Sequence, residues 1–284
     1  AVTDAAHARV AARGVEELGD VEEAGVPEEK AAEAPPAPPP VTDAARVGEI
    51  LRCAVDDAER IFDSEELHAT PWALLYDLEA WEGALRACAS AFGPTFEHRI
   101  ACSSNPVLLL LERADELGFG IACASMGEVA HALGNVHVEA DRVGFSSPCK
   151  TRTELQFALE RGLHVSVDSY EELARAADLV AAMPALPTGR AAPFGRVGVR
   201  VATATPDDDG GAPALGIDVG DAAAVARLGD ELEKRPWVDA VHAAPGASLV
   251  ASARRAVDVA NALRRRGAKI ACVDVGGGLG VDYA

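Results

Sequence analysis

From residue 71 onward, short apolar or β-branched runs alternate with longer stretches in which apolar residues recur three and four positions apart. The short runs are typical of buried strands, and the longer stretches are typical of amphipathic helices. The pattern predicts strands near residues 73–76, 99–102, 119–123, 142–145, 164–167, 196–201, 238–242 and 269–275. It predicts helices near residues 78–90, 107–117, 127–133, 151–161, 170–183, 222–234 and 252–266.

Polar residues mark the points where two of these helices begin. Thr151 is followed three residues later by Glu154, which is a capping-box pattern, and Asp168 and Ser169 precede another helix. The regular alternation of strands and helices predicts a parallel sheet with helical crossovers.

Two α/β architectures satisfy this alternation, an open doubly wound sheet and a (β/α)8 barrel. From Arg99 onward we count seven βα units, so we favour the barrel. The seventh strand and its glycine turn lie close to the last residue of the sequence. We therefore expect the eighth strand to be missing from this sequence.

Residues 1–65 have a different composition, rich in alanine, glutamate and proline, with the run APPAPPP at residues 34–40. Such proline runs favour extended polyproline II over packed elements. The segment holds 16 acidic residues against 6 basic ones. We interpret residues 1–65 as a disordered acidic tail or linker, and residues 71–284 as the incomplete barrel domain.

The charge and the cysteines exclude several classes of protein. The formal net charge of −19 disfavours binding to nucleic acid or to anionic lipid. No stretch reaches the roughly 18 to 20 apolar residues that a membrane helix needs, so we expect a soluble protein. The six cysteines form no C-x-x-C pair and have no histidine at metal-ligand spacing. We therefore expect no metal site and a reducing compartment, the cytoplasm or a plastid.

The strongest single chemical signal is the run GGGLG, which begins at Gly276 and follows an apolar strand. Glycines leave backbone N–H groups free to approach an anion such as a phosphate. A tight turn is the alternative interpretation, and the run alone does not separate the two.

Several short motifs occur together in a fixed order. They are LYDL at residues 75–78, CAS at residues 123–125 with Glu128, SPCK at residues 147–150, VDS at residues 167–169, VRV at residues 199–201 and the run from Gly276. Over residues 72–283 this set resembles the pyridoxal-phosphate-dependent ornithine, diaminopimelate and arginine decarboxylase family, and most of all its diaminopimelate-decarboxylase-type members.

The resemblance implies an alanine-racemase-like (β/α)8 barrel that holds the phosphate of pyridoxal phosphate at the glycine run. It also implies a C-terminal β domain, which the strand near residue 73 would join and which is missing from this sequence. It further implies an amino-acid substrate, a place in lysine or polyamine biosynthesis, and dimers with sites completed across the interface.

Family members carry a lysine at the end of the first barrel strand, where it forms a Schiff base with the cofactor. In this sequence Ser103 stands at that position, and a hydroxyl cannot form an imine. Ala122 replaces an acidic residue, and Ala244 replaces the histidine that stacks on the cofactor ring. Ala247 replaces a phosphate-contacting serine, and PALG at residues 213–216 replaces a further loop motif. The cofactor-contacting positions that still match the family are Arg200, His242, Gly246, Gly276, Gly277 and Gly278.

With no intact catalytic residue, we expect a barrel of the decarboxylase family that is catalytically impaired. Pyridoxal phosphate is the cofactor that the resemblance implies, but the lost contacts argue against its binding here. One alternative is an active decarboxylase that uses another lysine, and the chain has four: Lys30, Lys150, Lys234 and Lys269. Lys150 lies at the predicted rim, although a structural role suits it better. A non-catalytic regulatory subunit, in a homodimer or a heterodimer with an active homologue, and a fragment of a decaying gene are the other interpretations.

Overall fold

The computed structural model describes residues 45, 47–53, 74–183, 195–202, 215–244 and 249–277, together with the backbone of residues 6–11. The chain divides into two compact units, one made of residues 1–2 and 20–91 and the other of residues 3–19 and 92–284. The second unit contains the sheet and the candidate site. None of the described helices combines the length and the apolar content needed to cross a bilayer.

In the first unit, the described residues are helical at 47–53 and in α3 (Leu78–Phe92), which ends in the second unit. We predicted a strand near residues 73–76, and this prediction is wrong for the described residues 74–77, which form no strand. Asp77 instead begins α3, because its Oδ1 accepts a hydrogen bond of 3.0 Å from the backbone N–H of Ala80. A side-chain oxygen at this place satisfies a donor that the helix leaves open, so the chain turns into a helix here.

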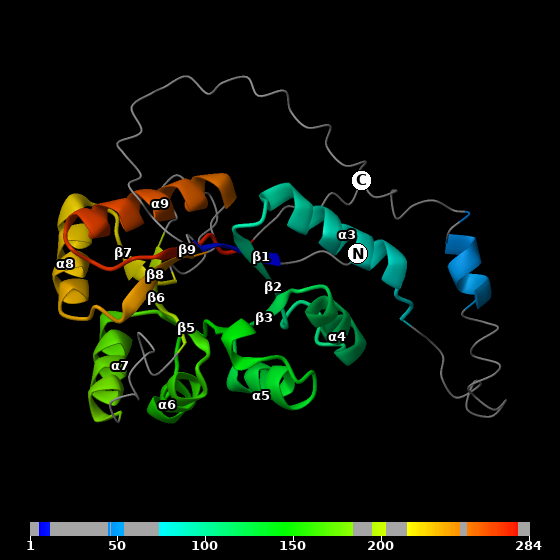
Figure 1. Ribbon diagram of the computed structural model, residues 1–284, viewed down its shortest axis with the longest axis horizontal. Coiled ribbons are helices and arrows are strands. Elements are labelled where there is room, and N and C mark those ends of the chain that lie inside the picture. Colours follow the sequence, from blue (N-terminus) through cyan, green and yellow to red (C-terminus); the bar gives the residue numbers. More distant parts are fainter. Residues whose placement is uncertain are drawn as a thin grey trace, which may run out of the picture. The chain divides into compact units, whose positions relative to one another are not determined.

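The second unit is built on a curled parallel sheet (Figure 1). Its seven main parallel strands are β2 (Phe96–Ala101), β3 (Gly120–Cys123), β4 (Val143–Phe145), β5 (His164–Val167), β6 (Val197–Ala202), β8 (Val238–Ala243) and β9 (Cys272–Asp274). These are the seven strands that the sequence predicted from Arg99 onward, with small shifts at their ends. A two-residue strand, β7 (Ile217–Asp218), adds to β6 and was not predicted.

The sheet closes into a ring through a strand that we did not predict. β1 (Ala6–Ala11) lies between β2 and β9 and pairs antiparallel with both. We expected residues 1–65 to form a tail, and Ala6–Ala11 lacks the continuous apolar run that marks the later strands. This strand pairs with residues 96–100 and 272–274, which are far from it in the sequence. A local sequence pattern therefore does not predict the strand.

Six helices surround this sheet on its outer side (Figure 1). They are α4 (Leu108–Glu116), α5 (Met126–Gly134), α6 (Arg152–Arg161), α7 (Tyr170–Ala182), α8 (Ala222–Glu233) and α9 (Leu249–Arg265), and a 3-10 turn, η1 (Ala140–Arg142), precedes β4. All six confirm predicted helices. The sheet residues and the inward faces of the helices form one core, which includes Ile121, Leu155, Val165, Val199 and Leu228.

Four of the helices begin at a polar side chain placed shortly after a strand. Thr151 and Glu154 form the predicted capping box of α6, with Thr151 Oγ1 accepting from the N–H of Glu154. Equivalent caps begin three more helices, at Ser125, Ser169 and Asp221. Each cap satisfies a backbone donor at the point where the chain leaves the sheet, so the helix start is fixed by one residue.

Candidate functional site

Several positions singled out from the sequence directly follow the carboxyl ends of parallel strands. Ser103 lies in the turn that follows β2 and is exposed. The turn is held by the neighbouring Ser104, whose Oγ donates a hydrogen bond of 2.7 Å to the carbonyl oxygen of Ala101. Ser103 therefore presents a solvent-facing hydroxyl at the first position of the rim.

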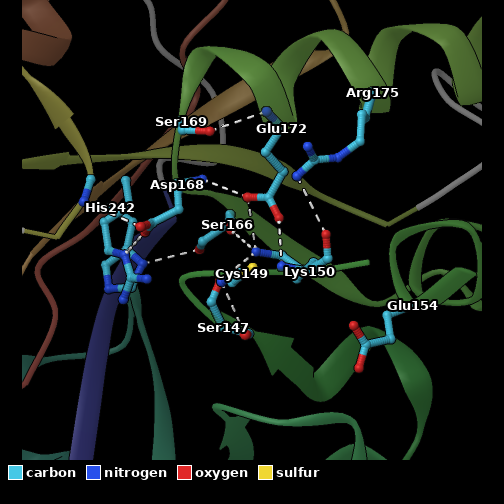
Figure 2. A network of polar contacts seen from close by, with 12 residues as sticks. Ser147, Cys149, Lys150, Glu154, Ser166, Asp168, Ser169, Glu172, Arg175 and His242 are labelled. Carbon is cyan, nitrogen blue, oxygen red and sulfur yellow. Dashed lines mark hydrogen bonds and ion pairs between the residues drawn. The ribbon is translucent and has the colours of Figure 1, made fainter. Parts of the chain in front are cut away.

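A network of buried polar contacts connects β5, β6 and α7 (Figure 2). The carboxylate of Asp168, at the end of β5, accepts from the Nε of Arg200 on β6 in an ion pair that is almost fully buried. The N–H of Asp168 donates to Oε2 of Glu172 at 2.7 Å, and its Oδ2 accepts from the N–H of Gly216 at 3.4 Å. Among the described residues, Nη2 of Arg200 has no hydrogen-bond partner. Arg200 is thus positioned chiefly by Asp168.

Lys150 is almost fully buried in this network, with 1% of its surface exposed, and Glu172 is equally buried. The Nζ of Lys150 donates to the carbonyl oxygens of Ser147 and Ser166, both at 2.7 Å, and to Oε2 of Glu172 at 3.1 Å. Burial lowers the pKa of the Lys150 ammonium, and the nearby Glu172 carboxylate opposes that shift. An ammonium has three donors, and here all three are used.

His242 extends the network to β8, the neighbour of β6. Its Nδ1 hydrogen-bonds to the Oγ of Ser166 at 3.0 Å, and both side chains are buried. Ser166 therefore links His242, through its hydroxyl, to Lys150, through its carbonyl oxygen. Figure 2 shows His242, Ser166 and Lys150 in this order.

A small cavity lies inside the ring, with about 270 Å³ of empty space when its open side is included. Its lining comes from six of the main strands and the segment after β4: Arg99, Ala122, Gly144, Phe145, Ser146, His164, Ser166, His242 and Asp274. Ala122, at one of the substituted positions, contributes a methyl group to this wall.

The described part of the glycine run, Gly276 and Gly277, makes contacts with neighbouring residues of the chain. Gly276 has a φ of +74°, which only glycine adopts without strain, and an added Cβ would lie 2.7 Å from the carbonyl oxygen of Ala243. The N–H of Gly276 donates to Oδ1 of Asp274 at 3.0 Å. Gly276 is buried and Gly277 is half-buried. This part of the run is therefore a tight turn closed by its own aspartate.

Ala244, at the position of the ring-stacking histidine, is buried, and its N–H donates to the carbonyl oxygen of Val201 at 2.9 Å. Five other singled-out positions lie outside the described residues, namely Pro213, Ala214, Gly246, Ala247 and Gly278.

Sequence reasoning missed Arg99, which crosses the interior of the ring. Its Nε donates to the carbonyl oxygen of Arg142 at 3.2 Å, and its Nη2 donates to Nδ1 of His164 at 2.9 Å. Gly120 and Gly144 make room for it, because a Cβ on either would meet the Arg99 side chain at 3.1 to 3.3 Å. Glycines on two adjacent inner strands were the signal that could have found this arginine.

Comparison with known proteins agrees with this architecture. Residues 79–214 match the family model for the pyridoxal-binding domain of pyridoxal-dependent decarboxylases. The L-glutamyl-[BtrI acyl-carrier protein] decarboxylase of Niallia circulans is 27% identical over 223 residues, which is 74% of this chain and 50% of that protein. The diaminopimelate decarboxylase of Methanothermobacter thermautotrophicus is 27% identical over 66% of this chain and 44% of that protein.

A solved structure shares the fold. Diaminopimelate decarboxylase from Helicobacter pylori, in complex with L-lysine, superposes with a TM-score of 0.56 at 20% identity, covering 73% of this chain and 55% of that one. The chain spans about half the length of the curated relatives that it matches. The family match agrees with the order of the seven parallel strands in the curled sheet. Residues 79–214 thus match the pyridoxal-binding domain of the pyridoxal-dependent decarboxylases, and the chain is similar in sequence and in fold to diaminopimelate decarboxylases.

Proposed function

We propose that this barrel does not form the covalent bond to pyridoxal phosphate and serves as a non-catalytic member of its family. The observation that carries the proposal is Ser103, which occupies the turn after β2 where the family motif has lysine. When bound, the cofactor supplies an electron sink through an imine to a lysine amine. A serine hydroxyl cannot condense with the aldehyde, so the residue at this position does not fit the cofactor.

Lys150 does not offer a substitute amine. All three of its donors are used, and its ion pair with Glu172 is almost fully excluded from solvent. Withdrawing the lysine would leave the Glu172 carboxylate buried without its partner, which typically costs about 3–5 kcal/mol. This bonding supports a structural role for Lys150.

The other described lysines, Lys234 and Lys269, are exposed and lie before β8 and β9, at the amino ends of those strands. In parallel barrels the chemistry lies at the carboxyl ends. Lys30 lies outside the described residues. The described chain therefore supplies no amine at the rim that could replace the missing lysine.

Retained polar positions are occupied by contacts within the protein. Arg200 pairs with Asp168, His242 bonds to Ser166, and Gly276 donates to Asp274. These contacts give Arg200, His242 and Gly276 a structural role that does not depend on catalysis, since removing one partner of a buried pair destabilises the fold. We place the lineage among amino-acid decarboxylases of the diaminopimelate type, in lysine or polyamine biosynthesis. We further propose that the chain acts in a homodimer or in a heterodimer with an active homologue.

The proposal is tested by adding pyridoxal phosphate to the purified chain and recording its visible absorbance before and after borohydride reduction. We expect no reducible imine band from the unaltered chain and a new band from Ser103→Lys. Ser104→Lys is the matched control, because Ser104 is exposed in the same turn and we expect no band there. A reducible band in the unaltered chain that is lost in Lys150→Met would overturn the proposal and establish Lys150 as the reactive amine.

A further inference from the structure

Two buried cysteines stand opposite each other at the carboxyl ends of β2 and β3, which are neighbouring parallel strands (Figure 1). The register of the two strands pairs Ala101 with Ala122. The next backbone hydrogen bond continues this register, because the N–H of Cys102 donates to the carbonyl oxygen of Ala122 at 2.9 Å. Cys102 therefore lies directly across from Cys123.

The two thiols lie on the same face of the sheet. Side chains alternate between the two faces along a strand, and Arg99 and Ala122 line the cavity inside the ring. Cys102 comes three residues after Arg99, so its side chain points to the outer face, towards the helices. Cys123 comes one residue after Ala122 and points the same way. Both belong to the hydrophobic core, with 0% and 1% of their surfaces exposed.

The spacing of the two strands suits a disulfide bond. Neighbouring strands lie about 4.8 Å apart, and the Cα atoms of a disulfide are usually about 4.4–6.8 Å apart. Both thiols are free in the structure. The other cysteines have no cysteine opposite them in the described strands: Cys53 and Cys88 lie in helices, Cys149 follows β4, and Cys272 stands opposite Ala240.

We infer that Cys102 and Cys123 are a redox-active pair, which a peroxide oxidises to a disulfide bond between β2 and β3. One thiol passes two electrons to the peroxide and becomes a sulfenic acid, with release of one water. The second thiol attacks that sulfur, which forms the S–S bond and releases a second water. One hydrogen peroxide is thus reduced to two waters while two thiols are oxidised. A dithiol reverses the reaction by exchange.

The oxidant reaches the pair through the adjoining turns. Exposed residues follow each cysteine directly, 103–104 after Cys102 and 124–125 after Cys123. Local opening at the end of a strand needs less free energy than global unfolding, so a small uncharged oxidant can reach the thiols while the barrel stays folded. Burial raises the pKa of both thiols, so their oxidation near neutral pH should be slower than that of the exposed Cys149.

The bond would act on the turn that holds Ser103. Cys102 immediately precedes Ser103, and Cys123 immediately follows Ala122 in the cavity wall. A disulfide here closes a loop that contains α4, and such a cross-link restricts the conformations that an open state can adopt. Oxidation would therefore lock the turn, and reduction would release it. This inference holds whether or not the cofactor binds, so it can fail or succeed independently of the proposed function.

Peptide mapping of the full chain tests the pair. Exposed thiols are first blocked with iodoacetamide under native conditions, and the chain is then treated with hydrogen peroxide and digested with trypsin without reduction. Cleavage after Arg113 separates the two cysteines into different peptides, residues 100–113 and 114–142. We expect these peptides to appear joined, lighter than their sum by two hydrogens, and to separate after treatment with dithiothreitol. Any other state of the two cysteines after oxidation would overturn the inference.

Two matched variants separate the cross-link from oxidation in general. Cys102→Ser removes one partner of the pair, and Cys272→Ser makes the same change at another buried cysteine, on β9. After peroxide treatment, we expect the joined peptides from the unaltered chain and from Cys272→Ser but not from Cys102→Ser. Loss of the joined peptides in Cys272→Ser as well would contradict the pairing.

The effect on the turn is tested by hydrogen exchange measured by mass spectrometry on the oxidised and reduced full chain. We expect oxidation to slow exchange at residues 102–107 by on the order of tenfold, because the joined strand ends can no longer open separately. Cys272→Ser should show the same slowing, and Cys102→Ser should show none. Unchanged exchange in the oxidised chain, or equal slowing in Cys102→Ser, would show that the bond does not lock this turn.

Discussion

The Nζ of Lys150 lies 3.1 Å from the Oε2 of Glu172, and the two side chains are 0% and 2% exposed. Glu172 also accepts from two backbone N–H groups, those of Lys150 and Asp168. The pair therefore joins the start of α6, the end of β5 and the first turn of α7. Lys150, one of the four lysines of the chain, therefore stabilises the barrel through this ion pair.

Removing one partner of this pair should destabilise the fold strongly. We expect Lys150→Met to lower the free energy of unfolding by about 3–5 kcal/mol, because the Glu172 carboxylate stays buried without its partner. Lys234→Met is the matched control, since the Lys234 side chain is 65% exposed in its ion pair with Glu231 and should change the free energy by about 0–1 kcal/mol. Urea unfolding followed by circular dichroism measures both. An equal decrease of the free energy of unfolding in the two variants would show that the Lys150–Glu172 pair does not stabilise the fold more than an exposed ion pair does.

The packing around Arg99 predicts that alanine substitutions at Gly120 and Gly144 destabilise the fold to different extents. In Gly120→Ala the new Cβ would collide with the backbone carbonyl oxygen of Arg142, so we expect a loss of about 1–3 kcal/mol, as for other overpacked interiors. In Gly144→Ala the nearest atom is the Cδ of the Arg99 side chain, at 3.3 Å. A side chain can shift by a few tenths of an ångström, so the loss should be smaller. Urea midpoints compare the two, and the reverse order would contradict this packing.

His98 predicts a fall of stability in mild acid. Its ring is buried among Phe92, Phe96 and Phe119, and neither ring nitrogen has a hydrogen-bond partner among the described residues. Burial lowers the pKa of His98 in the folded chain. Below the ordinary histidine pKa of about 6.5, the unfolded chain therefore binds more protons, and the free energy of unfolding decreases as the pH falls towards the lower pKa of the folded state.

Urea unfolding between neutral and mildly acidic pH measures this slope. His98→Leu should flatten it over the same interval. His137→Asn, which removes an exposed histidine from a position with a φ of +62°, is the control and should retain it. If His98→Leu has the same pH slope as the unaltered chain, the stability loss comes from other groups.

The cysteines should separate into two classes by reactivity. Burial raises the pKa of the Cys102 thiol to about 11, and that of Cys123 is raised further by burial and by the neighbouring Cys102. The thiolate is the reactive form, so both should resist alkylation near neutral pH. Cys53 and Cys149 are exposed and should react first. Timed labelling with iodoacetamide and peptide mass spectrometry gives the order, and early labelling of Cys123 would contradict the buried strand β3.

Local signals predicted most of this fold. The helices were found because each has apolar residues three and four positions apart, and some also have a polar start, as at Thr151 and Ser169. The main strands were found because a buried parallel strand is a short, continuous apolar run. The strand near residue 73 was predicted on the same signal and is wrong, because Asp77 starts a helix at once.

What depends on distant partners was not predictable. β1 contains alanine, histidine and arginine and becomes a strand only because two edges lie beside it. In the site, the sequence identified Arg200, His242 and Gly276, and it noted Asp168 only as a helix start and a motif residue. It did not predict their pairing with Asp168, Ser166 and Asp274. The Arg200–Asp168 and His242–Ser166 contacts each connect two strands, and the relative positions of two strands follow from the fold. A sequence motif describes only the residues of one strand and its loop.

The central claim is that no residue of this barrel bonds covalently to pyridoxal phosphate, and intact-protein mass spectrometry tests it most directly. The purified full chain is incubated with one equivalent of the cofactor, reduced with borohydride and weighed beside an untreated sample and beside Ser103→Lys. We predict that the unaltered chain keeps its mass and that Ser103→Lys gains one reduced pyridoxal phosphate group, located at residue 103. Stoichiometric addition of that group to the unaltered chain, at a single lysine, would contradict the account.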